Sequence, residues 1–361
     1  MKVAIVALGL ALSMPVVACV NDVDTRNLTL DERSPAAIAI EDFPRMPDSY
    51  YEARIKRLVQ LSPRLDLAEY DDLSVAYDRI GDSAKALETA LAREQAWSTG
   101  IKQDYSRLKD EIGGLQPETY LRYSGLANRG TFRIHLWFQR GKPKDISLLT
   151  TGLAELKQAV KINPNAHAGR EWAQIGVVEA VIQMAKGQRP NFDFGRNAAE
   201  TARGLLGLAE LGNAWTNPDI FALANMYAWK ADDKDLASLT YLRYRELTRY
   251  DNKATFGLTV KSAETIRPHR FTLARHTADR RHEQLVEFVE GRIKAGFDPD
   301  DEKFWDGYKR PEPIVVAFRD DSTWAQIRQF WSTWRLIIVP VSIPIFIYIL
   351  VKLLRKRHQL A

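Results

Sequence analysis

Histidine and carboxylate side chains are the groups in this sequence that could bind a metal ion. Three of the six histidines, His269, His276 and His282, lie close together in the chain. None of their spacings is the i, i+4 spacing that brings two ligands to one metal on a helix. We therefore expect no metal site at these histidines, and we expect them to be exposed or to cap helix ends.

An acidic run in the last third of the chain could in principle bind calcium. Its members are Asp298, Asp300, Asp301 and Glu302. An EF-hand loop that begins at Asp298 needs glycine at its sixth position and glutamate at its twelfth. The sequence has Lys303 and Lys309 there, so we expect a solvated acidic loop.

The motifs of nucleophilic and phosphate chemistry are absent. The sequence has no Gly-x-Ser-x-Gly elbow, no phosphate-binding Gly-Lys-Ser/Thr loop, no His-Glu-x-x-His pair and no dinucleotide fingerprint. A pair of carboxylates of the glycosidase type stays open, because such residues come from distant parts of a chain. We expect that the protein is not an enzyme and that it needs no cofactor.

The charge balance argues against nucleic acid as a partner. Lys and Arg number 51 against 46 Asp and Glu, which gives a net charge of +5. Four of the cations lie in the last ten residues, so the body is close to neutral. A nucleic-acid-binding domain needs a basic face, which this composition does not indicate.

The N-terminus has the parts of an export signal. Lys2 precedes an apolar run from Val3 to Ala18, and the single cysteine, Cys19, follows it. The stretch Val16–Cys19 resembles a bacterial lipobox, in which the cysteine is lipidated, although Val16 stands where leucine is usual. Lipidation of Cys19 and ordinary cleavage after Ala18 both stay open.

The C-terminus contains a second apolar segment, which we predict to be a transmembrane helix at residues 331–354. Leu336–Val351 carries no charge, and Trp331 and Trp334 precede it as interfacial anchors. The basic tail at 355–361 places the C-terminus in the cytoplasm. Both ends thus predict a single-pass protein of the cytoplasmic (inner) membrane whose body lies outside the cytoplasm, in the periplasm. A buried soluble helix is the alternative for this segment.

The body between these ends has helical periodicity. Residues 19–47 are polar and rich in proline, which predicts a linker. In the following region two apolar stretches flank Gly81–Asp82, which suits a sharp turn between helices. The small residues Ser74 and Ala86 would let these two helices approach closely, and Tyr77 would fill the space beside them.

The segment from Leu67 to Ala92 resembles a tetratricopeptide repeat (TPR). With Leu67 at position 1, the matching residues fall at positions 7, 8, 11, 20 and 24: Leu73, Ser74, Tyr77, Ala86 and Ala90. The departures are Arg93, where alanine is usual at position 27, and the lack of a closing proline. Degenerate copies lie at 117–139 with 153–166, and at 217–229 with the helix that follows, and another helical pair covers 171–184 and 196–211.

We therefore predict an all-α fold, a TPR-like solenoid of three to five helical hairpins with one C-terminal transmembrane helix. A non-repeating α-helical domain is the alternative. The predicted organisation is: signal peptide 1–18, linker 19–47, repeats 48–250, a mostly helical membrane-proximal region 251–330, the transmembrane helix and the tail. Within 251–330 we predict a helix from about His276 to Ala295.

The resemblance implies binding of a protein or peptide on the inner face of the solenoid, which first helices line. On the register above, the lining residues are Asp71, Asp78, Arg79, Phe221, Asn225 and Trp229. The expected function is a membrane-anchored interaction scaffold. A hydrolase of envelope polymers and a structural subunit of a membrane complex are the alternatives.

Overall fold

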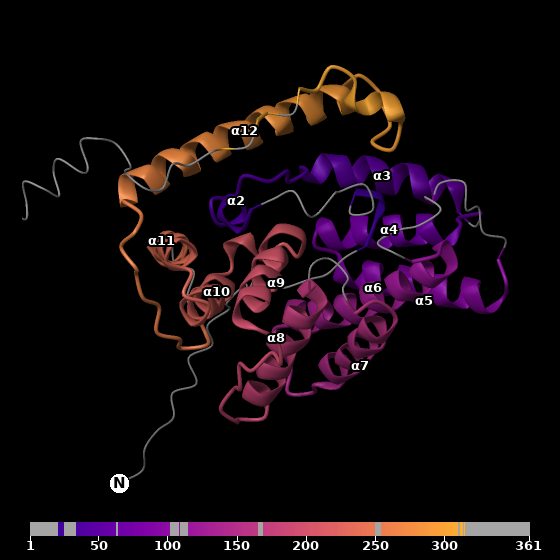
Figure 1. Cartoon of the computed structure of the whole chain (residues 1–361). Helices are drawn as coiled ribbons and strands as arrows, with labels where there is room; N and C mark the ends of the chain where they lie inside the picture. Colours follow the sequence, from indigo (N-terminus) through magenta and orange to yellow (C-terminus); the bar gives the residue numbers. More distant parts are fainter. Residues whose placement is uncertain are drawn as a thin grey trace, which may run out of the picture. The chain divides into compact units, whose positions relative to one another are not determined.

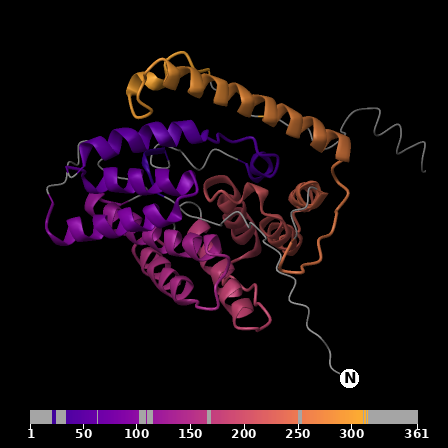
Figure 2. The ribbon, with the colours of Figure 1, turned by 180° about the vertical axis from the view of Figure 1, so that it is seen from behind.

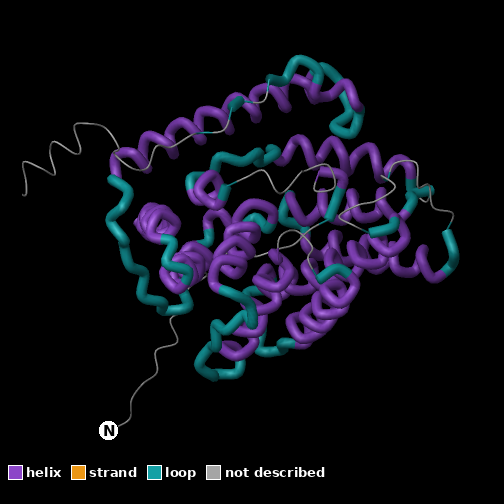
Figure 3. Tube along the Cα trace, in the orientation of Figure 1, coloured by secondary structure: helices purple, strands orange, loops and turns teal. Residues whose placement is uncertain are grey.

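The computed structural model describes residues 21–24, 34–62, 64–101, 108, 115–164, 169–249, 254–309, 311–312 and 314. These residues form an all-α structure without a β-strand (Figure 3). Cys19, the predicted signal at 1–18, the predicted transmembrane helix at 331–354 and the tail lie outside them, so the predictions made there stay predictions. Among the described helices, none has both the length and the apolar character that a bilayer crossing needs.

The helices follow the predicted periodicity closely. Their bounds are α2 Pro35–Ala39, α3 Asp48–Leu61, α4 Leu67–Arg79, α5 Ser83–Ser98, α6 Pro117–Gln139, α7 Ser147–Ile162, α8 Arg170–Ala185, α9 Ala198–Leu211, α10 Pro218–Lys230, α11 Lys234–Arg249 and α12 Pro268–Lys294, with 3₁₀ turns η4 Ala214–Thr216 and η5 Glu302–Trp305 (Figure 1). From α3 to α11 each helix packs against the next one in the sequence, and α4 also packs against α6. Contacts between helices that follow one another in the sequence are typical of stacked helical hairpins.

The α4–α5 hairpin shows why the local sequence folds in this way. Asp66 and Glu69 form a capping box that starts α4. Gly81 takes a φ of +83° in the turn, a conformation that glycine adopts without strain. Ser74 and Ala86 are fully buried, which confirms the prediction that small residues lie between the two helices.

Helices α6 and α7 approach each other through two glycines. A Cβ atom built on Gly152 would lie 2.6 Å from the backbone oxygen of Gly130, and one built on Gly130 would lie 2.8 Å from the oxygen of Gly152. Both distances are below any normal carbon–oxygen contact. The two backbones therefore touch where neither residue has a side chain.

The described parts of residues 19–47 belong to the folded body, which differs from the predicted linker. Ile38, Ile40 and Phe43 are buried, and α2 packs against α9 and α11. Asn21 and Asp22 are also buried. The polar and proline-rich composition suggested a linker. The few apolar side chains are nevertheless enough to pack the segment against the helical body.

Helix α12 begins at Pro268, earlier than the predicted start near His276. Proline suits the first turn of a helix, because its missing N–H has no helical partner there. Leu285 and Val289 pack with Tyr50 and Phe304, so α12 runs beside α3, as Figures 1 and 2 show from opposite sides.

Candidate functional site

The structure buries four of the six predicted lining residues. Asp71, Asp78, Phe221 and Asn225 have no more than 6% of their surface exposed. Arg79 is half-buried and donates to Asn213, whereas Trp229 is 37% exposed. A partner in solution cannot reach the four buried residues in this conformation, which corrects the expectation that they line an open surface.

Phe221 and Asp78 have structural roles. Phe221 belongs to the core formed by α9, α10 and α11. The Oδ1 atom of Asp78 lies 2.6 Å from Nδ1 of His135 and accepts a hydrogen bond from Ser83. These contacts join α4 to α5 and α6.

The reason for the burial near Asp71 is that the chain's own residues Asn21–Asp24, which we call the N-terminal segment, lie over this region. The backbone N–H of Asn21 donates to Oδ1 of Asn128 (2.7 Å), and Nδ2 of Asn128 donates to the Asn21 carbonyl (2.9 Å). The same Nδ2 donates to Asp71 (3.1 Å). The N–H of Val23 donates to Asp72 (2.7 Å). Side chains of α4 and α6 thus hold the backbone of the N-terminal segment, in which Val23 and Asp24 are helical.

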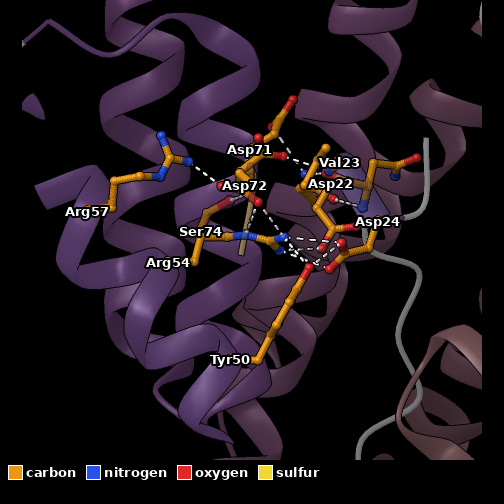
Figure 4. A network of polar contacts seen from close by, with 12 residues as sticks. Asp22, Val23, Asp24, Tyr50, Arg54, Arg57, Asp71, Asp72 and Ser74 are labelled. Carbon is orange, nitrogen blue, oxygen red and sulfur yellow. Dashed lines mark hydrogen bonds and ion pairs between the residues drawn. The ribbon is translucent and has the colours of Figure 1, made fainter. Parts of the chain in front are cut away.

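Helix α3 binds the acidic end of the N-terminal segment (Figure 4). Arg54 donates to both carboxylate oxygens of Asp24, at 2.9 and 3.1 Å, and the Tyr50 hydroxyl donates to Asp24 at 2.9 Å. Arg54 also lies 3.6 Å from Asp22. Burial by itself would raise the pKa of Asp24, but Arg54 and the hydrogen bonds from Arg54 and Tyr50 lower it below its ordinary value. We call Tyr50, Arg54, Asp72 and Asn128 the first segment site.

A buried ion pair between Arg93 and Asp71 lies next to this site. Nε of Arg93 lies 2.8 Å from Asp71, and Nη2 of Arg93 donates to the Leu121 carbonyl at 2.6 Å. The hydroxyl of Ser124 donates to Asp71 at 2.7 Å. A Cβ atom on Gly125 would lie 2.2 Å from Nη1 of Arg93, so glycine at this position of α6 leaves the space that the guanidinium needs. These contacts fix Asp71, and Asp71 in turn orients Asn128.

Helix α10 holds a second segment of the chain in the same way. Nδ2 of Asn225 donates to the Lys261 carbonyl (3.0 Å), and the Lys261 N–H donates to Oδ1 of Asn225 (3.1 Å). The indole of Trp229 donates to the same carbonyl (3.1 Å). Asp219 accepts hydrogen bonds from the N–H groups of Thr255 and Phe256. We call Asp219, Asn225 and Trp229 the second segment site.

The two segment sites share one hydrogen-bonding pattern. In each, the side chain of a helical asparagine accepts from the N–H and donates to the carbonyl of a single residue. The sequence identified Asn225 and Trp229 but missed Asp219, Asn128, Asp72, Arg54 and Tyr50. Asn128, a polar residue between the small residues Gly125 and Gly130 of α6, is a weak signal that the sequence offers. Arg54 gives no such signal, because arginine is common on exposed helix faces.

Among the described residues, no cluster of three or more candidate metal ligands occurs. His269 and His276 are exposed, and His282 is half-buried. Asp298 and Asp300 bind Arg57, so these two members of the acidic run form ion pairs in place of a solvated loop.

The stability of the chain should fall on acidification through His282. Burial and the nearby charge of Arg45 lower its pKa to about 4, although Asp279 opposes this. Between the unfolded value near 6.5 and about 4, the unfolded chain binds a proton that the folded chain does not, so folding weakens as the pH falls. We expect His282→Gln to remove about 1–2 kcal/mol of this loss at pH 4.5, after allowance for solvent screening.

The check is the free energy of unfolding in urea, measured from pH 7.5 to 4.5 for wild type and for His282→Gln. His276→Gln, at an exposed position of the same helix, controls for the removal of a histidine. Parallel curves for wild type and His282→Gln would contradict the assignment.

Comparisons of the chain with protein-family models, with curated proteins and with solved structures returned no match. The resemblance to tetratricopeptide repeats therefore depends on the residues of α4 and α5, and on the weaker copies, alone.

Proposed function

We propose that this chain is a TPR-type interaction scaffold that binds a protein or peptide partner through the inner helices of its hairpins. The proposal places it at the cytoplasmic membrane, with its body outside the cytoplasm. The observation that carries the binding proposal is the pair of segment sites. Both bind the backbone of a distant segment of the chain through helix side chains, and recognition of a peptide backbone needs contacts of this kind.

Recognition of this kind is largely independent of the ligand's sequence, because N–H and carbonyl groups occur at every residue. The carboxylate-binding pair, Tyr50 and Arg54, adds a preference for acidic side chains. A buried hydrogen bond to a charged group contributes about 1.5–3 kcal/mol. The first segment site thus combines affinity for backbone with selectivity for charge.

The test compares the proteins that co-purify from native membranes with the tagged full-length chain. We expect at least one partner whose recovery falls about five-fold or more when Asn128→Ala removes the backbone contacts of the first segment site. That partner must also bind the purified wild-type chain directly. The variant Asn197→Ala is the matched control, because it also removes an asparagine side-chain hydrogen bond, at the start of α9 and outside both segment sites. Identical sets of partners in wild type and Asn128→Ala would count against the proposal.

The membrane placement has a separate test. A topology reporter fused after residue 320 should be active outside the cytoplasm. Activity confined to the cytosol would refute the proposed orientation, whatever the outcome of the binding experiment.

A further inference from the structure

The two segment sites differ in how well their occupants fit. At the second site, both polar atoms of the Asn225 side chain are bonded, and Thr255 and Phe256 together satisfy Asp219. At the first site, the side chain of Asn21 is buried, yet neither its Oδ1 nor its Nδ2 has a hydrogen-bond partner among the residues that the structure describes. A buried amide without partners is destabilising. The N-terminal segment therefore occupies a site that a different sequence would fit better.

The remaining contacts of the N-terminal segment define what that better sequence is. The Asn21 backbone and the Val23 N–H make bonds that any residue could make. The carboxylates of Asp22 and Asp24, two residues apart, both face Arg54. A small residue in place of Asn21 would keep all of these contacts and would remove the buried amide.

From these contacts we propose that the N-terminal segment is a resting occupant of the first segment site, and that an acidic segment of a partner displaces it. The incoming segment presents a small residue followed by two carboxylates two residues apart. This proposal rests on the proposed function and specifies its ligand class and its regulation.

Two features of the site favour exchange. Arg54 also donates to Asp300 from Nε and Nη2, at 2.9 and 2.7 Å, so its charge stays paired when the N-terminal segment leaves. Asp24 is 28% exposed, which lets water and a competing carboxylate approach it. A covalently linked occupant has an effective concentration in the millimolar range, so a free ligand of equal fit binds only weakly until the linked segment is loosened.

The experiment measures the binding of a fluorescent peptide, Val-Ala-Asp-Val-Asp-Thr, to the full-length chain by anisotropy. This peptide is the chain's own sequence at 20–25 with alanine for the asparagine. We expect Asp24→Asn, which weakens the resting contact with Arg54, to bind the peptide about ten-fold more tightly than wild type. Adding Asn128→Ala to this variant should abolish the gain, whereas adding Asn197→Ala, which removes a helix-cap hydrogen bond of α9 outside both segment sites, should leave it unchanged. The peptide Val-Ala-Asn-Val-Asn-Thr should bind about ten-fold more weakly than the acidic one.

Equal affinity of wild type and Asp24→Asn, or of the acidic and the amide peptide, would overturn the proposal. Amide hydrogen exchange of the wild-type chain gives a second test that needs no substitution. A saturating amount of the acidic peptide should speed exchange at the Val23 N–H, and continued protection there would also overturn it. If acidic peptides fail but a partner still depends on Asn128, only the ligand class and the displacement are refuted. If acidic peptides bind but no partner depends on Asn128, the proposed function fails instead.

Discussion

Replacing Arg93 with methionine is expected to lower the free energy of unfolding by about 3–5 kcal/mol, because it leaves the Asp71 carboxylate buried without its cation. Both residues are at most 2% exposed. The guanidinium also donates to the carbonyls of Leu67 and Leu121, so its loss leaves those acceptors with fewer bonds. Urea unfolding followed by circular dichroism measures the effect.

The double variant Arg93→Met, Asp71→Asn tests the cause. Removing both charges should restore part of the stability, because the cost of a lone buried charge disappears. The free energy of unfolding will not return fully to the wild-type value, since Ser124 and Asn128 also donate hydrogen bonds to Asp71. A loss below about 1 kcal/mol for Arg93→Met, or a double variant no more stable than the single one, would contradict the assigned role.

Substitution of Gly152 by alanine is expected to cost about 2–3 kcal/mol. The added methyl group would lie 2.6 Å from the backbone oxygen of Gly130, and a backbone atom within a helix cannot move aside as a flexible side chain can. Overpacking of this kind costs about 1–3 kcal/mol or more, which outweighs the gain of up to about 1 kcal/mol from alanine's better helix propensity. Helices α6 and α7 must separate to admit the methyl group.

Gly291 provides the matched control. It lies inside α12, and a Cβ atom there would meet nothing within 4 Å. Gly291→Ala should therefore stabilise the chain by about 0.5–1 kcal/mol through helix propensity alone. The thermal midpoints of the two variants should move in opposite directions. A fall in both midpoints would show that the close contact of Gly152 is not the cause.

Arg93 and its neighbours in the segment that resembles a repeat show which features the sequence could not predict. Ser74, Ala86 and Ala90 follow the repeat pattern and are buried as expected. Arg93 breaks the pattern, and the sequence offered no explanation for it. The explanation lies on another helix, where Gly125 leaves room for the guanidinium and Leu121 accepts its hydrogen bond. A repeat pattern describes one hairpin and carries no information about such a neighbour.

The sequence by itself determined the helices and their order, because caps, turns and the 3.6-residue period act over a few residues. It placed α6 at 117–139 and the α4–α5 turn at Gly81 as observed. Only the tertiary structure decided what covers the helix faces. Asn21 meets Asn128 across 107 residues of chain, and Asn225 meets Lys261 across 36. Hydrogen bonds between such distant residues leave no local period in the sequence, so a residue predicted to bind a partner can instead bind the chain itself.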